Sequence, residues 1–278
     1  MSTISQRGHK SLVIGAPGSG KTWATATASL VPGKRVVYLM LENSLGVLVK
    51  ALKAMHNGKI PDNVHWHDFS FQGIGLDELE ASANAINALE GDNLKKWRSP
   101  MKKTNTGFSD LVKVLKDFTD HRTGESLGSA AEWDNNTIFV VDSMTALTDM
   151  IWNQSFGGRV SVDWTEYSAP QGLLMNFVTL FCWQAKCNFT MTAHVEDRET
   201  QQGSGVFKQY PLTIGGKLRD KLAGYFDDVI LAQRIGTNYV WNTATPQAEV
   251  KPRILPSAVN LKPDFVQIYE AIAKLEEQ

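Results

Sequence analysis

Apolar runs that end in polar or charged residues recur along this chain of 278 residues. Residues 11–14, 36–41 and 137–141 are largely continuous apolar runs, typical of parallel strands buried on both faces of a sheet. Residues 64–71 alternate and predict a further strand. Segments with helical spacing of apolar positions lie between the runs, at 22–30, 45–55, 76–89 and 108–118. Strands that alternate with helices predict a parallel sheet with right-handed crossovers.

The second half of the chain adds elements to this pattern. We expect a long apolar-rich helix at 169–186, a strand at 188–193 and a closing helix at 264–277. Residues 196–210 are polar and contain glycine, which predicts a loop. Three later β-like runs would extend the sheet, at 228–232, 239–242 and 249–255. The predicted fold class is α/β: a mostly parallel central sheet flanked by helices, with extra late strands.

A single domain is expected over residues 1–278, because no linker rich in proline, glycine or serine divides the chain. Residues 92–107 have the character of a basic insertion, and residues 256–278 that of a C-terminal helical tail. The lysines and arginine between 95 and 103 favour a solvated face over a contact with nucleic acid, although both interpretations stay open.

A loop with the pattern G-x-x-x-x-G-K-T follows the first apolar run directly. Its glycines let backbone N–H groups point at phosphate oxygens, its lysine reaches the β- and γ-phosphates, and its threonine offers a hydroxyl to Mg²⁺. An apolar strand before the loop and a helix after it are the context that phosphate binding requires. The predicted nucleotide-binding residues are Gly15, Pro17, Gly18, Ser19, Gly20, Lys21 and Thr22.

Three polar residues stand at the carboxyl ends of predicted strands, where parallel sheets bind their ligands. Asp142 follows an apolar strand, as expected of a carboxylate that holds Mg²⁺ opposite Thr22. Glu42 could activate the attacking water, or it could serve as a helix N-cap or first-turn acid. His194 could sense the γ-phosphate, although a histidine at a strand end is more often structural.

Charge and cysteine content narrow the classes of function. The formal net charge is −1, from 28 basic and 29 acidic residues, so any nucleic acid must bind to local patches. Two cysteines, Cys182 and Cys187, in an apolar stretch favour a reduced, cytoplasmic protein. The polar N-terminus predicts no signal peptide, and polar residues interrupt the longest apolar stretch, at 173–189, so no membrane span is expected.

The order of these motifs resembles that of the RecA-like ATPases. Residues 140–148 are similar to the Walker B segment of RecA, and residues 39–45 to the segment that holds its catalytic glutamate. The resemblance implies a RecA-like P-loop core over residues 11–255 that binds ATP and Mg²⁺, with Glu42 as the catalytic base, Lys21 on the phosphates and His194 as the γ-phosphate sensor. It also implies two DNA-binding loops, at 153–164 and 195–210. Residues 212–217 resemble the glycine pair that follows the second loop.

Departures from that family are equally specific. Gly46 and Val49 stand where RecA has the aspartate and tyrosine that contact adenine, which leaves the base preference open. A compact core with histidine as sensor is similar to phage RecA-like ATPases of the single-strand annealing (Sak) type. That resemblance implies a phage-encoded protein in the bacterial host cytoplasm. Its partners would be single-stranded DNA, further copies of itself in a filament or ring, and a single-strand-binding protein.

Weaker candidates concern DNA and the neighbouring subunit. Lys251 and Arg253 could reach the γ-phosphate of a neighbouring subunit as fingers, or they could be solvated residues at a strand end. Aromatic and basic residues in or beside the two loops suit single-stranded DNA, with ordinary loop packing as the alternative. The candidate DNA-binding residues are Arg159, Trp164, Phe207 and Lys208.

Three functions are compatible with this set of motifs. The first is a DNA-stimulated ATPase of recombination or strand annealing that assembles with ATP at subunit interfaces. The second is a hexameric helicase or translocase on the same core, because fold alone does not separate the two. The third is a binding module in which ATP only joins subunits; a general base such as Glu42 argues against it.

Overall fold

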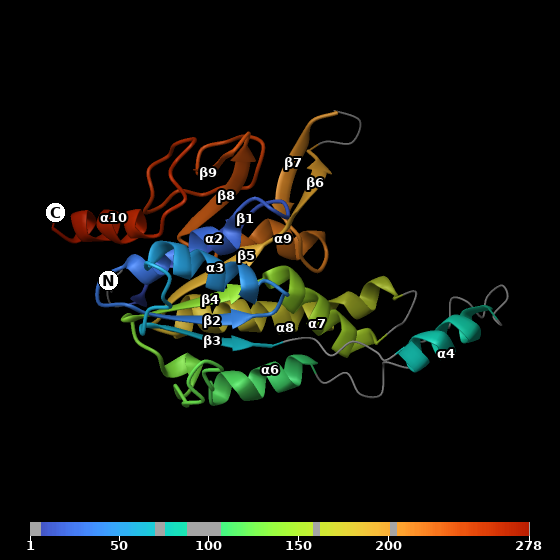
Figure 1. Cartoon of the computed structure of the whole chain (residues 1–278). Coiled ribbons are helices and arrows are strands. Elements are labelled where there is room, and N and C mark those ends of the chain that lie inside the picture. Colours follow the sequence, from blue (N-terminus) through green and yellow to red (C-terminus); the bar gives the residue numbers. More distant parts are fainter. Residues whose placement is uncertain (1–6, 70–75, 88–106, 158–161, 201–204, 278) are drawn as a thin grey trace.

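The computed structural model of the chain describes residues 7–69, 76–87, 107–157, 162–200 and 205–277. Its main sheet has seven strands in the order β3-β2-β4-β5-β1-β8-β9, and every neighbouring pair is parallel except the antiparallel pair β8–β9 (Figure 1). The strands are β1 Lys10–Ile14, β2 Arg35–Met40, β3 Val64–Asp68, β4 Thr137–Asp142, β5 Asn188–Ala193, β8 Asp228–Ile235 and β9 Asn238–Asn242. This topology confirms the predicted fold class, a RecA-like P-loop core with late strands added to its sheet.

Helices cover both faces of the sheet because successive strand residues point to opposite sides. On one face, Val36, Tyr38 and Met40 of β2 share an apolar cluster with α2, α3 and α10. On the other face, Val37 and Leu39 join a second cluster with α6, α7 and α8 (Figure 1). The helices are α2 Lys21–Ala26, α3 Leu45–Met55, α4 Leu76–Asn87, α6 Gly107–Lys116, α7 Met144–Phe156, α8 Ser168–Thr179, α9 Gly216–Leu222 and α10 Val266–Glu276.

Short helical turns complete these layers. They are η1 Thr27–Leu30, η3 Ala130–Glu132, η4 Trp164–Tyr167 and the π-helical turn η5 Leu180–Gln184. The predicted helix at 169–186 is therefore an α-helix that ends in a π-turn. None of the helices in the described ranges combines the length and the hydrophobicity that a membrane crossing requires.

The register of the strands brings their carboxyl ends to one edge of the sheet. Ile14 of β1 pairs with Ala193 of β5, and Met40 of β2 pairs with Asp142 of β4. The glycine loop, Glu42, Asp142 and His194 all follow or end these strands, so the fold gathers them at this edge.

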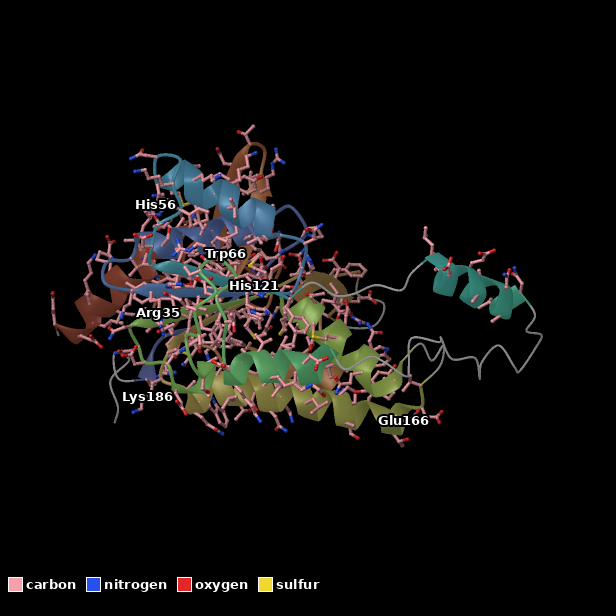
Figure 2. All side chains as sticks on the ribbon, turned by 60° about the horizontal axis from the view of Figure 1, so that its bottom comes forward. Arg35, His56, Trp66, His121, Glu166 and Lys186 are labelled. Carbon is pink, nitrogen blue, oxygen red and sulfur yellow. The ribbon has the colours of Figure 1, made fainter. Side chains whose placement is uncertain are left out.

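Segments outside the strands cover part of both lateral edges of the sheet. Beside β3, the backbone carbonyl of Trp66 accepts a hydrogen bond from the backbone N–H of His121, and the backbone N–H of Trp66 donates to Asp120 Oδ1. Figure 2 labels Trp66 and His121 at this edge. Beside β9, Trp241 and Leu261 exchange two backbone hydrogen bonds of 2.8 Å. These contacts leave fewer free backbone groups along the outer strands.

The polar stretch predicted as a loop is a β-hairpin instead. β6 Val195–Glu199 pairs with β7 Phe207–Pro211 in a separate two-stranded sheet. An ion pair between Glu196 and Arg219 of α9 fastens the hairpin to the body, and the Arg219 guanidinium lies 4.8 Å from the Tyr210 ring centroid. Polar side chains on both faces suit a ribbon that protrudes into solvent (Figure 1).

The predicted strand at 249–255 is wrong. Only Lys251 forms a bridge there, with Val229 of β8. Pro252 has no N–H to donate to a ladder. The next three backbone N–H groups, of residues 253–255, donate to Asp228 Oδ1 rather than to a strand.

Candidate nucleotide-binding site

The glycine loop between β1 and α2 is tied closely to the neighbouring strands. The backbone N–H of Gly15 donates a 3.1 Å hydrogen bond to the carbonyl of Ala193 at the end of β5. A Cβ atom on Gly15 would lie 2.4 Å from the carbonyl oxygen of Ala232, so glycine alone fits without displacement of β8. Gly18 and Gly20 have φ angles of +75° and +87°, the left-handed region that favours glycine.

Lys21 lies against the inner side of this loop. Its Nζ donates to the carbonyl oxygens of Gly15 at 2.8 Å and Ala16 at 3.1 Å. Burial lowers the pKa of the Lys21 ammonium, while the carboxylates of Asp142 and Glu42 act to raise it. The fold thus holds the Lys21 amine against the backbone of the glycine loop, with the carboxylates of Asp142 and Glu42 nearby.

The loop also carries a hydroxyl with unused hydrogen-bonding capacity. Ser19 Oγ is buried and has no hydrogen-bond partner within the described ranges. Pro17 and Gly18 are exposed at the tip of the loop. A buried, unpartnered hydroxyl beside an amine in a glycine-rich loop fits the oxygens of a phosphate chain.

Asp142 accepts hydrogen bonds from three hydroxyl groups. Thr22 Oγ1 lies 2.7 Å and Ser44 Oγ 3.1 Å from Asp142 Oδ2, and Thr192 Oγ1 donates to Oδ1. Hydroxyl and carboxylate oxygens suit Mg²⁺, which usually takes its other ligands from phosphates and waters. Among the described residues, no group of three His, Cys, Asp or Glu is arranged to hold a metal ion. Thr22 and Asp142 therefore fit Mg²⁺ together with a nucleotide.

Glu42 and His194 lie side by side and border the same cavity as Asp142 and Lys21. Ser143 Oγ donates to Glu42 Oε1, and His194 Nε2 lies 3.4 Å from the same oxygen. The other ring nitrogen of His194, Nδ1, lies 3.3 Å from Lys21 Nζ. Glu42 does not cap α3, because Ser44 is the N-cap residue and the first turn contains no acid. The helix-capping alternative for Glu42 is therefore wrong.

Backbone contacts place His194 at the root of the β6–β7 hairpin. Its N–H donates to Thr145 Oγ1 at 2.9 Å, and its carbonyl accepts from the N–H of Leu212 at 2.8 Å. β6 begins at the next residue, Val195. One residue thus borders the cluster of charged side chains and closes the base of the protruding hairpin.

Lys21, Thr22, Glu42, Asp142 and His194 line a single cavity of about 400 Å³. Three of its lining residues come from outside the predicted motifs: Trp23 of α2, Val47 of α3 and Tyr239 of β9. The full lining is Pro17, Gly18, Gly20, Lys21, Thr22, Trp23, Glu42, Val47, Asp142, His194 and Tyr239. The structure thus brings Glu42, Asp142 and His194 together with the loop, as the strand-end pattern predicts, and adds an apolar part that the pattern does not reveal.

The structure describes three of the four candidate DNA-binding residues, and their role in DNA binding stays a prediction. Phe207 is exposed on β7, and Lys208 forms an ion pair with Glu249. Arg159 lies outside the described residues, and Trp164 begins η4. The first predicted loop, at 153–164, is wrong in its first part, because α7 continues to residue 156.

The finger candidates lie at the opposite edge of the sheet from the glycine loop. Lys251 Nζ donates to the carbonyl oxygens of Ala223 at 3.3 Å and Phe226 at 2.7 Å, and Arg253 Nη1 lies 3.3 Å from Asp227 Oδ1. Within this subunit both side chains are thus bound near the amino ends of β1 and β8. Their contact with a neighbouring subunit stays a prediction.

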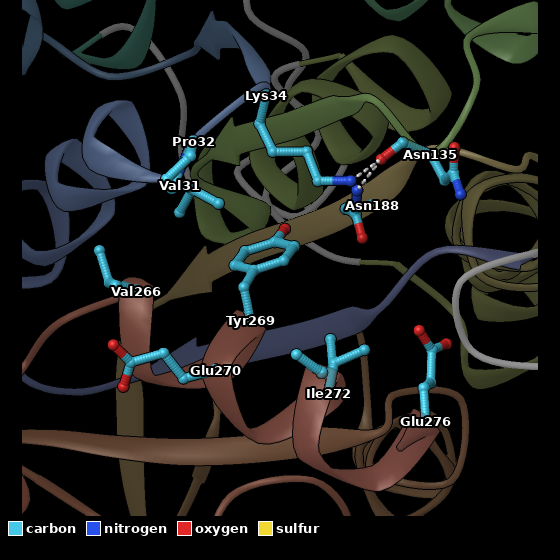
Figure 3. A pocket seen from close by; sticks show the side chains of 11 residues that line it. Val31, Pro32, Lys34, Asn135, Asn188, Val266, Tyr269, Glu270, Ile272 and Glu276 are labelled. Atoms are coloured by element: carbon cyan, nitrogen blue, oxygen red, sulfur yellow. Dashed lines mark hydrogen bonds between the residues drawn. The ribbon is translucent and has the colours of Figure 1, made fainter.

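A second cavity, of about 410 Å³, lies at that same amino edge of the sheet (Figure 3). It is mainly apolar and is bordered by Tyr269 of α10, by Val31 and by Pro32. Lys34 Nζ donates a 2.7 Å hydrogen bond to the carbonyl of Asn135 there, and lies 5.7 Å from the Tyr269 ring centroid. Its lining includes neither the glycine loop nor Glu42 or Asp142, so it is separate from the candidate nucleotide site.

One family model covers most of the chain, including the glycine loop. The sequence model of the AAA domain family matches residues 7–251. No curated protein matches the sequence significantly. Among solved structures, the RadB recombinase is 17% identical, with a TM-score of 0.41 over 89% of this chain and 82% of that chain.

A prototypical ATPase from the type III secretion system of pathogenic bacteria is also similar, at 10% identity and a TM-score of 0.37. The similarity covers 83% of this chain and 55% of that one, so the chain spans about half the length of the secretion ATPase.

Proposed function

This chain belongs to the AAA domain family and is a P-loop ATPase, and we propose that it couples ATP hydrolysis to the binding of single-stranded DNA in recombination or strand annealing. The observation that carries the proposal is the position of His194, which borders Glu42 and Lys21 through its ring and closes the β6–β7 hairpin through its backbone.

The loop residues Gly15 to Thr22 would hold the triphosphate. Lys21 would place its ammonium on the β- and γ-phosphates, and Ser19 would donate its hydroxyl to a phosphate oxygen. Thr22 and Asp142 would hold Mg²⁺, which when bound neutralises the charge that develops on the phosphates. Backbone N–H groups and a fixed amine need little rearrangement for this task, which is how preorganised sites stabilise developing charge.

Glu42 is the candidate general base. Its carboxylate borders the cavity, where it can accept a proton from a water molecule that attacks the γ-phosphate. Ser143 and His194 orient the carboxylate from two sides. A module that uses ATP only to join subunits would not need such a base.

His194 would transmit the state of the γ-phosphate to the hairpin. A change in charge beside its ring alters the balance of its contacts with Glu42 and Lys21. Movement of the residue then shifts the closing contact between His194 and Leu212, which sets the direction of β6 and β7. Such a two-sided contact is the physical basis for coupling between a nucleotide site and a DNA site.

DNA would bind along the hairpin and along the segment 153–164. The exposed ring of Phe207 suits base stacking, and Lys208, Arg159 and Trp164 would add cations and a further ring. Since the chain has a net charge of −1, one subunit would bind weakly and a homo-oligomer, a filament or ring, would sum many contacts. A phage origin, action in the host cytoplasm and cooperation with a single-strand-binding protein belong to this proposal.

An ATPase assay with and without single-stranded DNA, combined with electron microscopy of the assembled protein, tests the proposal. We expect turnover that rises with DNA and an open assembly on the strand. Closed rings that unwind duplex DNA in one direction would instead identify a helicase or translocase. ATP binding without turnover would identify a binding module.

Replacement of His194 by alanine is expected to reduce DNA-stimulated turnover more than basal turnover, because it removes the link between the cavity and the hairpin. The measurement is the ratio of the two rates in wild type and in His194→Ala, and we expect that ratio to fall several-fold. Equal loss of both rates would indicate a purely catalytic or structural histidine.

The double variant Arg159→Ala, Lys208→Ala is expected to bind single-stranded DNA more weakly and to show a shallower dependence of affinity on salt, because it removes two cations. Its DNA-free ATPase rate should stay at the wild-type level. Lys262→Ala, which removes an exposed lysine that pairs with Asp264, is the control. Unchanged DNA affinity in the double variant would point to the basic insertion at 92–107, which lies mostly outside the described residues.

A further inference from the structure

The candidate nucleotide cavity has an apolar end as well as a charged one. At the charged end, the His194 ring lies 3.3 Å from Lys21 Nζ through Nδ1 and 3.4 Å from Glu42 Oε1 through Nε2. Asp142 accepts a hydrogen bond from Thr22, the residue after Lys21. The remaining large side chains of the lining carry no charge. They are Trp23, Val47 and Tyr239, which come from three different elements and are 37%, 47% and 41% exposed.

Tyr239 is held against the glycine loop itself. A Cβ atom on Gly20 would lie 2.7 Å from Cδ1 of the Tyr239 ring and 3.1 Å from its Cγ, so the absence of a side chain at Gly20 lets the ring approach the loop. The Arg234 guanidinium lies 5.7 Å from the ring centroid and its Nε donates to the carbonyl of Gly236. The β8–β9 hairpin thus presents an aromatic ring at the mouth of a phosphate-binding loop.

Exposed aromatic rings beside a phosphate site require an explanation, because such surface is costly to leave in water. A nucleobase is a flat group with apolar faces, attached to the phosphates by a ribose. It stacks on aromatic side chains whichever substituents its ring carries. A nucleotide with its phosphates at Lys21 would carry its base to the open part of the same cavity.

Apart from the Tyr239 hydroxyl and the Trp23 indole N–H, which stand on ring edges, the apolar end offers ring faces and methyl groups and no amide side chain that could pair a donor and an acceptor with a base. Gly46 has no side chain, and Val49 is half-buried against the apolar cluster of α3. Gly46 and Val49, the positions where RecA has its adenine contacts, therefore supply no polar side chain to a base.

We infer that Tyr239, with Trp23 and Val47, is the platform for the nucleobase, and that this platform stacks the base without reading it. The substrate class is then purine nucleoside triphosphates in general, with ATP and GTP accepted alike and pyrimidine nucleotides bound more weakly through their smaller rings. This inference rests on the proposed ATPase function, because that function places the triphosphate of the nucleotide on the glycine loop.

The test compares nucleotides with tripolyphosphate, which has no base, by calorimetry on the full chain with Mg²⁺. For wild type, we expect the dissociation constants of ATP and GTP to agree within about threefold. Tyr239→Ala should weaken both about tenfold, or about 1.4 kcal/mol, with tripolyphosphate unchanged. Tyr239→Phe should bind as wild type does. Trp183→Ala, which removes an exposed aromatic stacked on Tyr225, is the matched control.

Each other outcome overturns the inference in a recognisable way. Preference for ATP over GTP by more than about twentyfold would mean that the base is read by hydrogen bonds. An equal loss of tripolyphosphate and ATP affinity in Tyr239→Ala would mean that the ring only supports the loop. Unchanged ATP affinity with loss of self-association would assign Tyr239 to a subunit contact. If wild type bound neither nucleotides nor tripolyphosphate, the proposed ATPase function itself would fail.

Discussion

Replacement of Lys21 by alanine is expected to abolish nucleotide turnover, with kcat/KM lower by at least about 10²–10³-fold, the cost of losing one preorganised group that stabilises transition-state charge. Lys21 Nζ is held by the carbonyl oxygens of Gly15 and Ala16, so its charge is fixed at the glycine loop before any phosphate arrives. Steady-state rates and nucleotide affinity, measured together, check this result.

Lys34→Ala provides the control for Lys21→Ala. Lys34 also donates its amine to a backbone carbonyl, that of Asn135, but does so at the opposite edge of the sheet. Both variants lose a partly buried ammonium, so they should lower the unfolding midpoint by comparable amounts while only Lys21→Ala loses turnover. A Lys21→Ala protein that is folded and hydrolyses ATP at the wild-type rate would refute the assignment of the loop.

Glu42→Gln is expected to keep ATP binding and to lose hydrolysis by about 10²–10⁴-fold, because the amide preserves the shape of the carboxylate but cannot accept a proton. The amide oxygen can still accept the hydrogen bond from Ser143, so the local structure should persist. The variant should also hold the ATP-bound assembly on single-stranded DNA, and filter binding with ATP present would detect that complex.

Asp149→Asn is the matched control for Glu42→Gln. Burial and the nearby charge of Glu42 raise the pKa of Asp149, so this second carboxyl group senses the same environment. It does not line the cavity. We expect Asp149→Asn to turn over ATP normally. If it lost hydrolysis instead and Glu42→Gln did not, the base would be a different carboxylate from the one that the RecA resemblance implies.

The central strands could be predicted from the sequence because they are buried on both faces. The predicted strand at 188–193 matches β5, and the predicted run at 137–141 differs from β4 by one residue. A strand that is apolar throughout is visible without any knowledge of its neighbours. Because parallel strands run in the same direction, their carboxyl ends lie at one edge of the sheet. Glu42, Asp142 and His194 follow or end such strands, so the sequence predicts that they lie together at this edge.

Other parts of the site depend on contacts that periodicity does not contain. Tyr239 reaches the glycine loop only because β8 pairs with β1 and turns back into β9, a pairing between segments more than 200 residues apart. The β6–β7 hairpin is not predicted because, beyond Val195 and Pro211 at its base, its residues lie outside the apolar core, so its sequence lacks the apolar alternation that marks a half-buried strand. The sequence predicts that Trp23 lies in a helix, as it does in α2, but its place at the cavity depends on the conformation of the loop before that helix.

The covered edges of the main sheet restrict how copies of this chain can associate. His121 and Asp120 occupy backbone groups along β3, and Leu261 does the same along β9. A sheet whose outer strands already have hydrogen-bonding partners has few sites at which a strand from another copy could be added. Any filament or ring would then be joined by side chains across surfaces, with contacts that can form and break at each catalytic cycle, rather than by a continuous intermolecular sheet. The same protection lowers the tendency of the folded chain to aggregate through its strands.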